Sequence, residues 1–260
     1  MKIKAFIEAV ERRIPKRWAE EWDNPGLAFG DENADIERVA VSLDATPDTV
    51  QRAAEAGCQL LFTHHPLIFR PLKHVYESVP PQRTLITAVQ KNVALYAAHT
   101  NWDASPEGVN VILAQKLGLR NIGKLEHTDV EGSFGIGAVG CLEQLMTVKE
   151  VMALVRDAWA CRNLTGFGDA ERKVLRIALG GGACGSMWQL ALDRGAELFI
   201  TADISYHDRN EALYKGLNLI VTDHGEMERV SLPALCGLIR EETNVEVVQL
   251  EESYVERINL

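Results

Sequence analysis

The stretch that most constrains the fold is Leu60-Leu61-Phe62-Thr63-His64-His65-Pro66. This apolar run of strand length ends in polar residues and a proline, which predicts a short buried strand with two histidines at its end. In open α/β sheets, ligands bind outside the carboxyl ends of the strands, so a site is expected there. Adjacent strand residues point to opposite faces, so His64 and His65 fit two metal ions better than one, unless the strand has already ended. The alternative is one hydrogen-bonded core histidine beside one surface histidine.

Strand-like runs alternate with helix-like segments along the whole chain. Apolar spacing predicts helices over residues 4–14, 47–57, 83–91, 109–117 and 148–159, and a long last helix that opens at residues 225–228. Apolar runs predict strands over residues 39–44, 93–99, 134–142, 174–179, 198–201, 217–222 and 245–248. Helices of this length between strands favour βαβ units, and we therefore expect an α/β protein with mainly parallel sheets.

The two halves of the chain follow the same plan. The order strand, helix, strand, helix, strand ends at His99-x-x-x-Asp103 in the first half and at His224-x-x-x-Glu228 in the second. This repetition predicts a duplicated, two-domain α/β fold. Polar residues and glycines interrupt the apolar pattern over residues 121–132, so we expect domains over 1–125 and 126–260. The sequence leaves open whether the last helix and strand pack back on the first half.

Histidines and carboxylates that follow strand ends form a candidate set of metal ligands: His64, His65, Asp103, His224 and Glu228. If a helix begins at once after His224, then His224 and Glu228 share a helix face and can address one ion. A mixed nitrogen and oxygen set suits zinc, manganese or iron, and the absence of thiolates from it argues against a structural zinc cage. A pair of ions about 3.5–4 Å apart activates water and stabilises a leaving group, so the set predicts hydrolytic chemistry.

Two further histidines, His99 and His207, follow other strand ends together with Asp203. Histidine titrates near neutral pH, so His99 and His207, together with Asp203, are candidates to donate or shuttle protons during catalysis. The alternative is that His99 supports the metal ligands through hydrogen bonds and that His207 caps a helix.

The glycine cluster Gly180 to Ser186 keeps the outline of a phosphate-binding loop but lacks its lysine, which argues against an ATPase or GTPase of that class. Backbone amides at a helix start would still favour an anion. Cys184 lies in this loop without a neighbouring histidine in the sequence, so a small packing residue is favoured over a reactive thiol.

The composition restricts the partners and the compartment. The net charge of -10, with no Lys/Arg-rich run to offset it, argues against nonspecific nucleic-acid binding. Five scattered cysteines form no C-x-x-C pair, which fits a reducing compartment better than a disulfide framework. No apolar stretch approaches the roughly 20 residues that a membrane span needs. We therefore expect a cytoplasmic protein that acts on a small-molecule substrate without a membrane.

Five motifs together resemble one known family. They are Trp22-Asp23-Asn24-x-Gly26-Leu27, Leu43-Asp44-Ala45-Thr46-Pro47, Thr63-His64-His65-Pro66-Leu67-Ile68-Phe69, Ala98-His99-Thr100-Asn101-x-Asp103 and His224-x-x-x-Glu228. The chain resembles, from about residue 18 to 230, the short form of the Nif-three-like dinuclear metal-centre family, whose members are labelled GTP cyclohydrolase 1 type 2 homologues.

The resemblance implies a duplicated α/β fold, a dinuclear site between the halves with two divalent ions per chain, and ring-shaped homohexamers. By position, it carries the metal ligands over onto His64, His65, Asp103, His224 and Glu228. Trp102 stands where leucine is common in the family, and we expect it to narrow the pocket. The implied function is a dinuclear metal-dependent hydrolase acting on a nucleotide or a related small molecule. The rival function is a noncatalytic, metal-bound hexameric scaffold or interaction protein.

Overall fold

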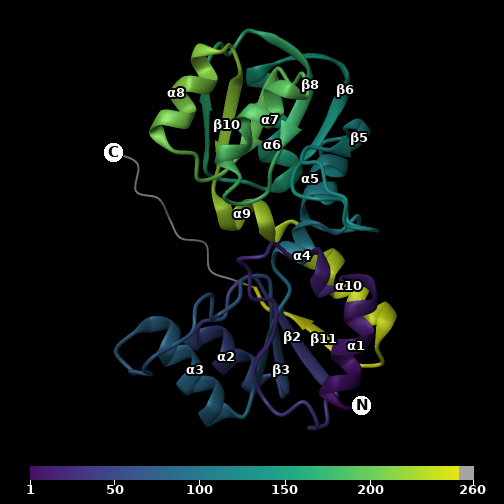
Figure 1. Cartoon of the computed structure of the whole chain (residues 1–260), viewed down its shortest axis with the longest axis vertical. Coiled ribbons are helices and arrows are strands. Elements are labelled where there is room, and N and C mark those ends of the chain that lie inside the picture. Colours follow the sequence, from purple (N-terminus) through teal and green to yellow (C-terminus); the bar gives the residue numbers. More distant parts are fainter. Residues whose placement is uncertain (252–260) are drawn as a thin grey trace. The chain divides into compact units, whose positions relative to one another are not determined.

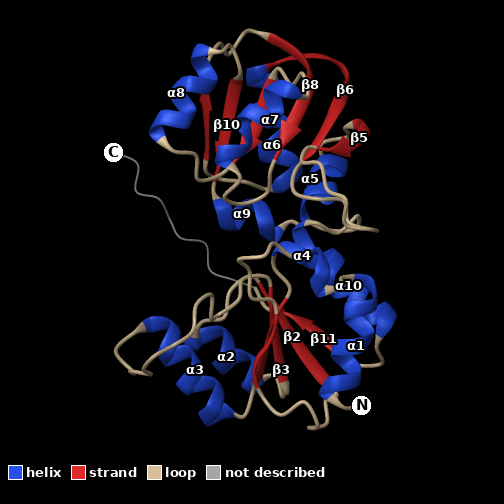
Figure 2. Cartoon of the chain, in the orientation of Figure 1, coloured by secondary structure: helices blue, strands red, loops and turns tan. Residues whose placement is uncertain are grey.

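The computed structural model describes residues 1–251, which fall into two compact units (Figures 1 and 2). Of the described residues, the first unit contains 1–102 and 232–251, and the second contains Asp103–Ser231. The chain therefore crosses from one unit to the other at residue 103 and returns at residue 232. Among the described residues, none of the helices has both the length and the apolar character that crossing a bilayer requires.

The first unit is built on a five-stranded sheet in the order β1-β4-β3-β2-β11. Its strands are β1 (Gly26–Phe29), β2 (Arg38–Ser42), β3 (Leu60–Thr63), β4 (Ala94–Ala97) and β11 (Glu246–Gln249). The pairings β4–β3, β3–β2 and β2–β11 are parallel, and β1 pairs antiparallel with β4 at the edge. The strand at the end of the chain thus belongs to the first sheet.

The second unit is built on a six-stranded sheet in the order β5-β6-β8-β9-β10-β7. Its strands are β5 (Arg120–Lys124), β6 (Ala138–Thr147), β7 (Leu164–Phe167), β8 (Lys173–Leu179), β9 (Leu198–Thr201) and β10 (Asn218–Thr222). Among the described strands of this second sheet, only the pairings β8–β9 and β9–β10 are parallel. The pairings β5–β6, β6–β8 and β10–β7 are antiparallel. The domain boundary predicted at residues 125 and 126 lies directly after β5.

Both sheets are therefore mixed, and the α/β expectation is confirmed in that coarser form. The sequence analysis missed β1, β5 and β7, which are edge strands that pair antiparallel with their neighbours. The reason is physical: β5 and β7 contain no fully buried residue, so they lack the continuous apolar run that marked the inner strands.

The two sheets share the order of four strands. In each, an antiparallel edge strand (β1 or β7) lies beside the last of three parallel strands, which run β4-β3-β2 in one sheet and β10-β9-β8 in the other. His99 follows β4 and His224 follows β10, so the two His-x-x-x-acid segments follow topologically equivalent strands.

Helices cover both faces of the first sheet. They are α1 (Ile3–Arg13), α2 (Pro47–Glu55), α3 (Pro80–Lys91) and α10 (Leu232–Glu242), with a short η1 (Lys16–Trp18). In Figure 1, α2 and α3 lie on one side of the sheet and α1 and α10 on the other. The alternation of β3 explains this, because Leu61 packs with Val50 and Ala88 while its neighbour Phe62 meets Phe6 of α1 at 6.4 Å between ring centroids.

The second unit contains α5 (Val109–Lys116), α6 (Val148–Trp159), α7 (Trp188–Asp193), α8 (Tyr206–Tyr214) and α9 (His224–Arg229), with a short η2 (Gly185–Met187). Trp188 of α7 and Ala212 of α8 pack in one cluster with Phe199 of β9. Trp159 of α6 donates its indole N–H to the carbonyl of Leu113 in α5 at 3.2 Å, which joins these two helices. A single turn, α4 (Thr100–Asp103), carries the chain from the first unit to the second.

The predicted long last helix is wrong, because it is two helices. The first, α9, ends at Arg229, and α10 begins at Leu232 in the first unit. Pro233 explains the break: proline has no amide N–H and is tolerated in the first turn of a helix but not in its interior.

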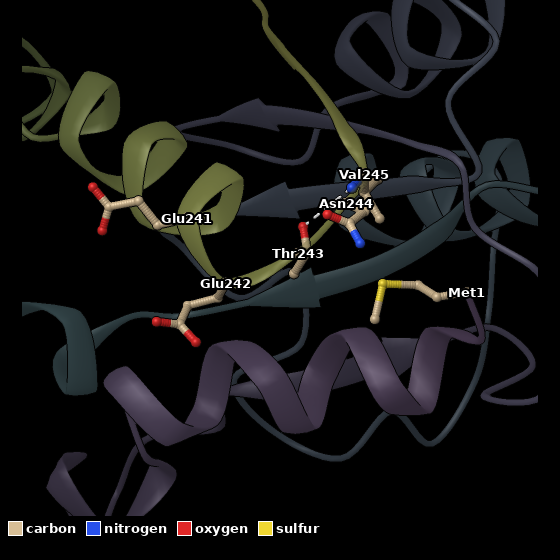
Figure 3. A pocket seen from close by; sticks show the side chains of 6 residues that line it. All are labelled: Met1, Glu241, Glu242, Thr243, Asn244 and Val245. Carbon is tan, nitrogen blue, oxygen red and sulfur yellow. Dashed lines mark hydrogen bonds between the residues drawn. The ribbon is translucent and has the colours of Figure 1, made fainter.

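A pocket in the first unit is lined by Met1 and by residues 241–245 (Figure 3). Two of its lining residues are acidic, and Arg13 of α1 reaches Glu242 at 2.8 Å. No candidate metal ligand lines this pocket, so it is separate from the histidine cluster described next.

Candidate metal centre

His64 and His65 directly follow β3, where the backbone is still held by its neighbour. The amide of His64 donates to the carbonyl of Ser42 at 3.3 Å, and that of His65 donates to the carbonyl of Leu43 at 3.0 Å. The strand has ended at Thr63, and the two imidazole rings lie only 5.0 Å apart between centroids. The strand end therefore does not separate the two rings onto opposite faces.

His99 joins these two histidines from the end of β4. Its ring centroid lies 5.2 Å from that of His64 and 5.6 Å from that of His65. One ligand atom from each of the three residues lies within 4.8 Å of the others, so the first unit alone brings together a three-histidine cluster able to hold a metal ion. The cluster is shielded from solvent, since His64 is fully buried and the side chain of His99 is only 12% exposed.

Each ring in the three-histidine cluster is held through its Nδ1 atom by an oxygen. Nδ1 of His64 contacts the carbonyl of Ala98 at 3.0 Å, Nδ1 of His65 contacts Asp44 at 2.8 Å, and Nδ1 of His99 contacts Asp23 at 2.9 Å. Carbonyls and ionised carboxylates only accept hydrogen bonds, so Nδ1 carries the proton in each contact. All three rings consequently present Nε2 as their ligand atom, which is the arrangement that metal-binding histidines use.

Asp23 is the most strongly held of these acceptors. Its side chain is fully buried, and besides His99 it accepts from the amide of Thr100 at 3.0 Å and from the hydroxyl of Thr100 at 2.5 Å. Burial raises the pKa of Asp23, but the hydrogen bonds from His99 and Thr100 and the charge of His99 outweigh it and lower the pKa to about 2. Asp23 is therefore ionised at neutral pH and fixes the orientation of His99.

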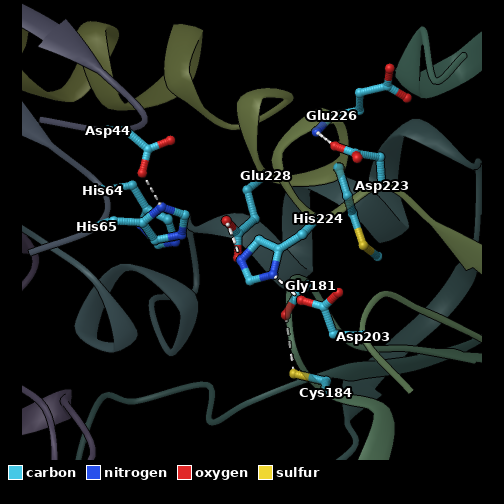
Figure 4. A network of polar contacts seen from close by, with 12 residues as sticks. Asp44, His64, His65, Gly181, Cys184, Asp203, Asp223, His224, Glu226 and Glu228 are labelled. Atoms are coloured by element: carbon cyan, nitrogen blue, oxygen red, sulfur yellow. Dashed lines mark hydrogen bonds and ion pairs between the residues drawn. The ribbon is translucent and has the colours of Figure 1, made fainter. Parts of the chain in front are cut away.

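In the second unit, α9 begins at His224, so the condition for a shared helix face is met. Asp223 is the N-cap, and its side chain accepts from the amide of Glu226 at 3.1 Å. Nε2 of His224 then lies 3.1 Å from Oε2 of Glu228, while Nδ1 of His224 contacts Asp203 at 2.6 Å (Figure 4). His224 thus contacts carboxylates through both ring nitrogens.

Asp103 ends the turn α4 and lies close to Glu228. A carboxylate oxygen of Asp103 lies within 4.8 Å of one of Glu228, and both residues are buried, at 7% and 2% exposure. The side-chain amide of Asn110 donates to the carbonyl of Asp103 at 3.0 Å and fixes the backbone there. Two buried carboxylates this close repel each other, and a divalent cation would compensate their charge.

Trp102 does not narrow a pocket, contrary to expectation. Its side chain is fully buried and is one of the largest buried side chains among the described residues. The indole ring is accommodated in the core.

The donor sets of both units fit divalent transition metals. Bonds from zinc to histidine nitrogen and carboxylate oxygen are about 2.0–2.2 Å, so a separation of 3.1 Å between Nε2 of His224 and Oε2 of Glu228 suits two ligands of one ion. A neutral imidazole donates at one nitrogen only, and Asp203 already accepts that proton. The contact with Glu228 therefore needs a further positive charge, which a metal ion would supply.

The glycine loop gives these ligands room. A Cβ atom built on Gly182 would overlap Oε1 of Glu228 and come within 3.1 Å of Nε2 of His224. The amide of Gly181 donates to the side chain of Asn110 at 2.9 Å, and the amide of Cys184 donates to the carbonyl of Gly182. Because the loop uses these amides internally, it clears space for side chains and does not resemble an open anion cradle.

Cys184 packs within the same loop. Its Sγ atom lies 3.1 Å from the carbonyl of Gly181 (Figure 4), and a Cβ atom on Gly180 would overlap its Cβ atom. The packing interpretation of this thiol is favoured by these contacts.

His207 lies apart from the residues that form the metal-competent groups. It is exposed near the start of α8, and its ring meets that of Tyr206 at 5.3 Å between centroids. Among the described residues, the groups able to hold a metal do not include His207.

The sequence analysis missed the carboxylates that hold the histidines. Asp44 and Asp23 stood in quoted motifs without an assigned role, and Asp203 was considered only as a proton carrier. Asp44 and Asp203 each directly follow a strand region, which was a usable signal. Asp23 lies 76 residues before His99 in a loop, and no periodic pattern could connect the two.

Comparison with known proteins identifies the family. Residues 1–254 match the family described as Duf34/NIF3 (NGG1p interacting factor 3). The chain belongs to this family. A relative from Clostridium perfringens named "GTP cyclohydrolase 1 type 2 homolog" is 31% identical over 255 residues, covering 97% of each chain. Another of that name, from Streptococcus pneumoniae, is 33% identical over 222 residues, covering 84% of this chain and 83% of its own.

Solved structures of other proteins have the same fold. A Bacillus cereus protein described as related to NIF3 superposes with a TM-score of 0.92 at 21% identity, covering 100% of this chain and 99% of its own. A Staphylococcus aureus protein superposes with a TM-score of 0.89 at 26% identity over the same shares. The resemblance drawn from the five motifs is thereby confirmed at the level of the family.

Proposed function

We propose that this Duf34/NIF3 protein is a dinuclear metal-dependent hydrolase that acts on a nucleotide or a related small molecule. Two divalent ions per chain, zinc, manganese or iron, are held by ligands from both units: His64, His65, Asp103, His224 and Glu228. The names of the relatives agree with a hydrolytic reaction on a nucleotide but describe those proteins only as homologues.

One observation carries the proposal: the three histidine ligands and the neighbouring His99 are each oriented through Nδ1 by an oxygen acceptor. The acceptors are the carbonyl of Ala98 and the carboxylates of Asp44, Asp23 and Asp203, at 2.6–3.0 Å. Structural histidines rarely need this uniform orientation, whereas metal ligands do. The buried carboxylates of Asp103 and Glu228 add the negative charge that divalent ions require.

Each unit by itself offers only part of a dinuclear ligand set. The first unit contributes imidazoles, and the second contributes two carboxylates and one imidazole. The chain passes between the units directly at Asp103 and three residues after Glu228. Bound divalent ions would supply the Lewis acidity that activates water and stabilises a leaving group.

His99 is proposed to hold or move a proton beside the ligands, since Asp23 orients its ring. Two exposed aromatic side chains flank it. Trp22, 62% exposed, and Phe69, 46% exposed, meet the His99 ring edge-on at 5.9 and 5.4 Å between centroids. Exposed rings of this kind offer surfaces on which a planar heterocycle can stack, which supports a nucleotide-like substrate.

Three further features belong to the proposal because they rest on the family resemblance. They are a homohexameric assembly, a duplication as the origin of the two units, and a cytoplasmic location. The shared four-strand order of the two sheets supports the duplication.

The decisive experiment combines metal analysis with an activity screen of the metal-loaded protein against nucleotides, phosphoesters and cyclic amides. We expect two ions per chain and hydrolysis that requires added divalent metal. Asp103→Ala should lower kcat/KM by roughly a thousandfold without unfolding the protein, since metal activation contributes several kcal/mol. One ion at saturating metal would contradict the dinuclear centre. Two ions with no turnover of any substrate would favour the noncatalytic scaffold.

His207 is proposed as a second proton carrier, although its exposed position on α8 gives it less support than His99. His207→Ala should then slow turnover more than it weakens metal binding, and His99→Ala should slow it further. Equal losses of turnover and metal affinity in His207→Ala would make it a ligand.

A further inference from the structure

Asp203 combines two unusual features at the metal centre. Its carboxylate contacts Nδ1 of His224 at 2.6 Å, the shortest of the four histidine contacts (Figure 4). Its backbone has φ of 47°, in the left-handed region that non-glycine residues seldom adopt. Left-handed residues cost free energy and persist where surrounding structure or function maintains them.

The surrounding chain holds this conformation in place. The amide of Ala202 donates to the carbonyl of Gly182 at 3.1 Å, directly before Asp203. Directly after it, the backbone of Ile204 packs so closely on Gly185 that a Cβ atom there would overlap it. Ser205 then caps α8 by accepting from the amide of Asp208 at 3.1 Å. Neighbours on both sides therefore hold the corner at Asp203.

These backbone contacts would be available to any residue at position 203, including glycine. What only an acidic or amide side chain supplies is the acceptor for Nδ1 of His224. The side chain of Asp203 is 59% exposed, so its removal leaves no buried cavity. A glycine at this position would therefore relieve the backbone cost while removing the contact with His224.

We propose that Asp203 is a positioning residue for the metal ligand His224. Its carboxylate keeps the proton on Nδ1 and aims Nε2 at the ion shared with Glu228, and this is why the left-handed conformation is kept with a non-glycine residue. The inference rests on the proposed metal centre. It replaces the earlier expectation that Asp203 shuttles protons.

If Asp203 only stabilised the fold, its replacement by glycine would lower the stability of the metal-free protein. The proposal predicts no such loss, and the two roles can therefore be distinguished. Asp203→Gly should bind manganese roughly 10- to 100-fold more weakly, the usual loss when an outer partner of a metal ligand is removed. The metal-free variant should be as stable as the wild type or more so. Asp203→Asn retains a carbonyl oxygen that accepts from Nδ1, so its manganese affinity should lie closer to the wild type than that of Asp203→Gly.

Asn121→Gly is the matched control. Asn121 has φ of 53° in the edge strand β5, so its replacement also relieves a left-handed backbone. We expect a similar change in stability and less than about a twofold change in manganese affinity.

Three measurements on full-length protein decide the matter: calorimetric titration with manganese, urea unfolding of the metal-free protein, and nitrogen NMR of the His224 tautomer without metal. The expected result is an Nδ1–H tautomer in the wild type that is lost in Asp203→Gly together with manganese affinity. Wild-type manganese affinity in Asp203→Gly, or a matching loss of stability and affinity, would overturn the proposal.

The tautomer measurement separates this inference from the proposed function. If the wild-type protein binds no divalent ion, the metal centre fails, yet the NMR spectra still show whether Asp203 fixes the proton on Nδ1. If metal binds and Asp203→Gly leaves the tautomer unchanged, only the positioning role of Asp203 fails.

Discussion

The two units offer different donor atoms to a metal ion. The first unit gathers three imidazoles, His64, His65 and His99, whereas in the second unit Glu228 lies close to the imidazole of His224 and to the carboxylate of Asp103. The first unit therefore offers a nitrogen-rich set and the second an oxygen-rich one. The difference shows that fold fixes where ligands stand, while the residues after the strands fix what they bind.

The two sets also differ in how their histidines are held. In the first unit, His99 is oriented by the fully buried Asp23, which also accepts two hydrogen bonds from Thr100. In the second, His224 is oriented by Asp203, which is 59% exposed and held by its backbone conformation. His99 is thus held by a buried, hydrogen-bonded acceptor, whereas His224 is held by an acceptor on a constrained turn.

The largest expected effect concerns Glu228, because the carboxylates among the candidate ligands, Asp103 and Glu228, belong to the second unit, and the two oxygens of a carboxylate can each bind a separate cation. Glu228 lies next to both His224 and Asp103 within its unit, which suits a bridge between two ions. Glu228→Gln should weaken both ions by more than roughly 100-fold, beyond the loss typical of residues that only support ligands. His64→Ala and His65→Ala should each spare one ion.

Manganese titration calorimetry on the three variants measures this. If Glu228→Gln retained one ion at native affinity, the bridge between the ions would be Asp103 or a water molecule, and not Glu228.

A smaller effect is expected from Gly182→Ala, which tests how closely the second unit packs around its carboxylate. A Cβ atom there would overlap Glu228, and φ of 69° adds a cost of about 1–2 kcal/mol for a non-glycine residue. Gly118→Ala is the control, because Gly118 has φ of 68° with open space around its Cβ position.

The left-handed backbone should lower the free energy of unfolding by a similar amount in both variants. In Gly182→Ala, the overlap with Glu228 should lower it further. Only Gly182→Ala should bind manganese more weakly, by roughly tenfold. Urea unfolding and calorimetry check the two quantities, and equal manganese affinities in the two variants would show that the loop yields without moving Glu228.

The sequence predicted the inner strands and long helices well because their periodicity reflects burial on a defined face. The helix over residues 148–159 and the strand over 198–201 match α6 and β9 at both ends. Edge strands such as β7 were missed because their half-exposed residues do not form a continuous apolar run. The last helix was predicted too long because the pattern continues through Pro233, where the backbone cannot.

The candidate ligands could be found from the sequence because each follows a strand or starts a helix. Their orientation could not. The contacts of His65 with Asp44 and of His224 with Asp203 each join residues 21 positions apart on neighbouring strands. Such contacts depend on sheet order, and that of His99 with Asp23 depends on a loop that only the folded chain places.

The smallest expected effect is the acid sensitivity of the first unit, which follows from the buried Asp23. Its pKa is lowered to about 2 in the folded protein, below its value of 3.8 in the unfolded chain. A depressed pKa contributes stability that is present above about pH 4 and is lost as the pH falls toward 2. We expect Asp23→Asn to lower the free energy of unfolding by about 1–2 kcal/mol near pH 6, because the amide nitrogen cannot accept the hydrogen bonds from Thr100. The difference from the wild type should shrink between pH 4 and pH 2 in metal-free protein.

Asp35→Asn is the control in the same unit, because Asp35 is 74% exposed in its contact with Lys2 and an exposed ion pair contributes about 0–1 kcal/mol. Urea unfolding across this pH range compares the variants. A difference between wild type and Asp23→Asn that stays constant down to pH 2 would mean that hydrogen-bond geometry, and not the ionised carboxylate, stabilises the loop around His99. In that case the charge of Asp23 would not be what orients His99. The two units would then differ only in the donor atoms that they offer.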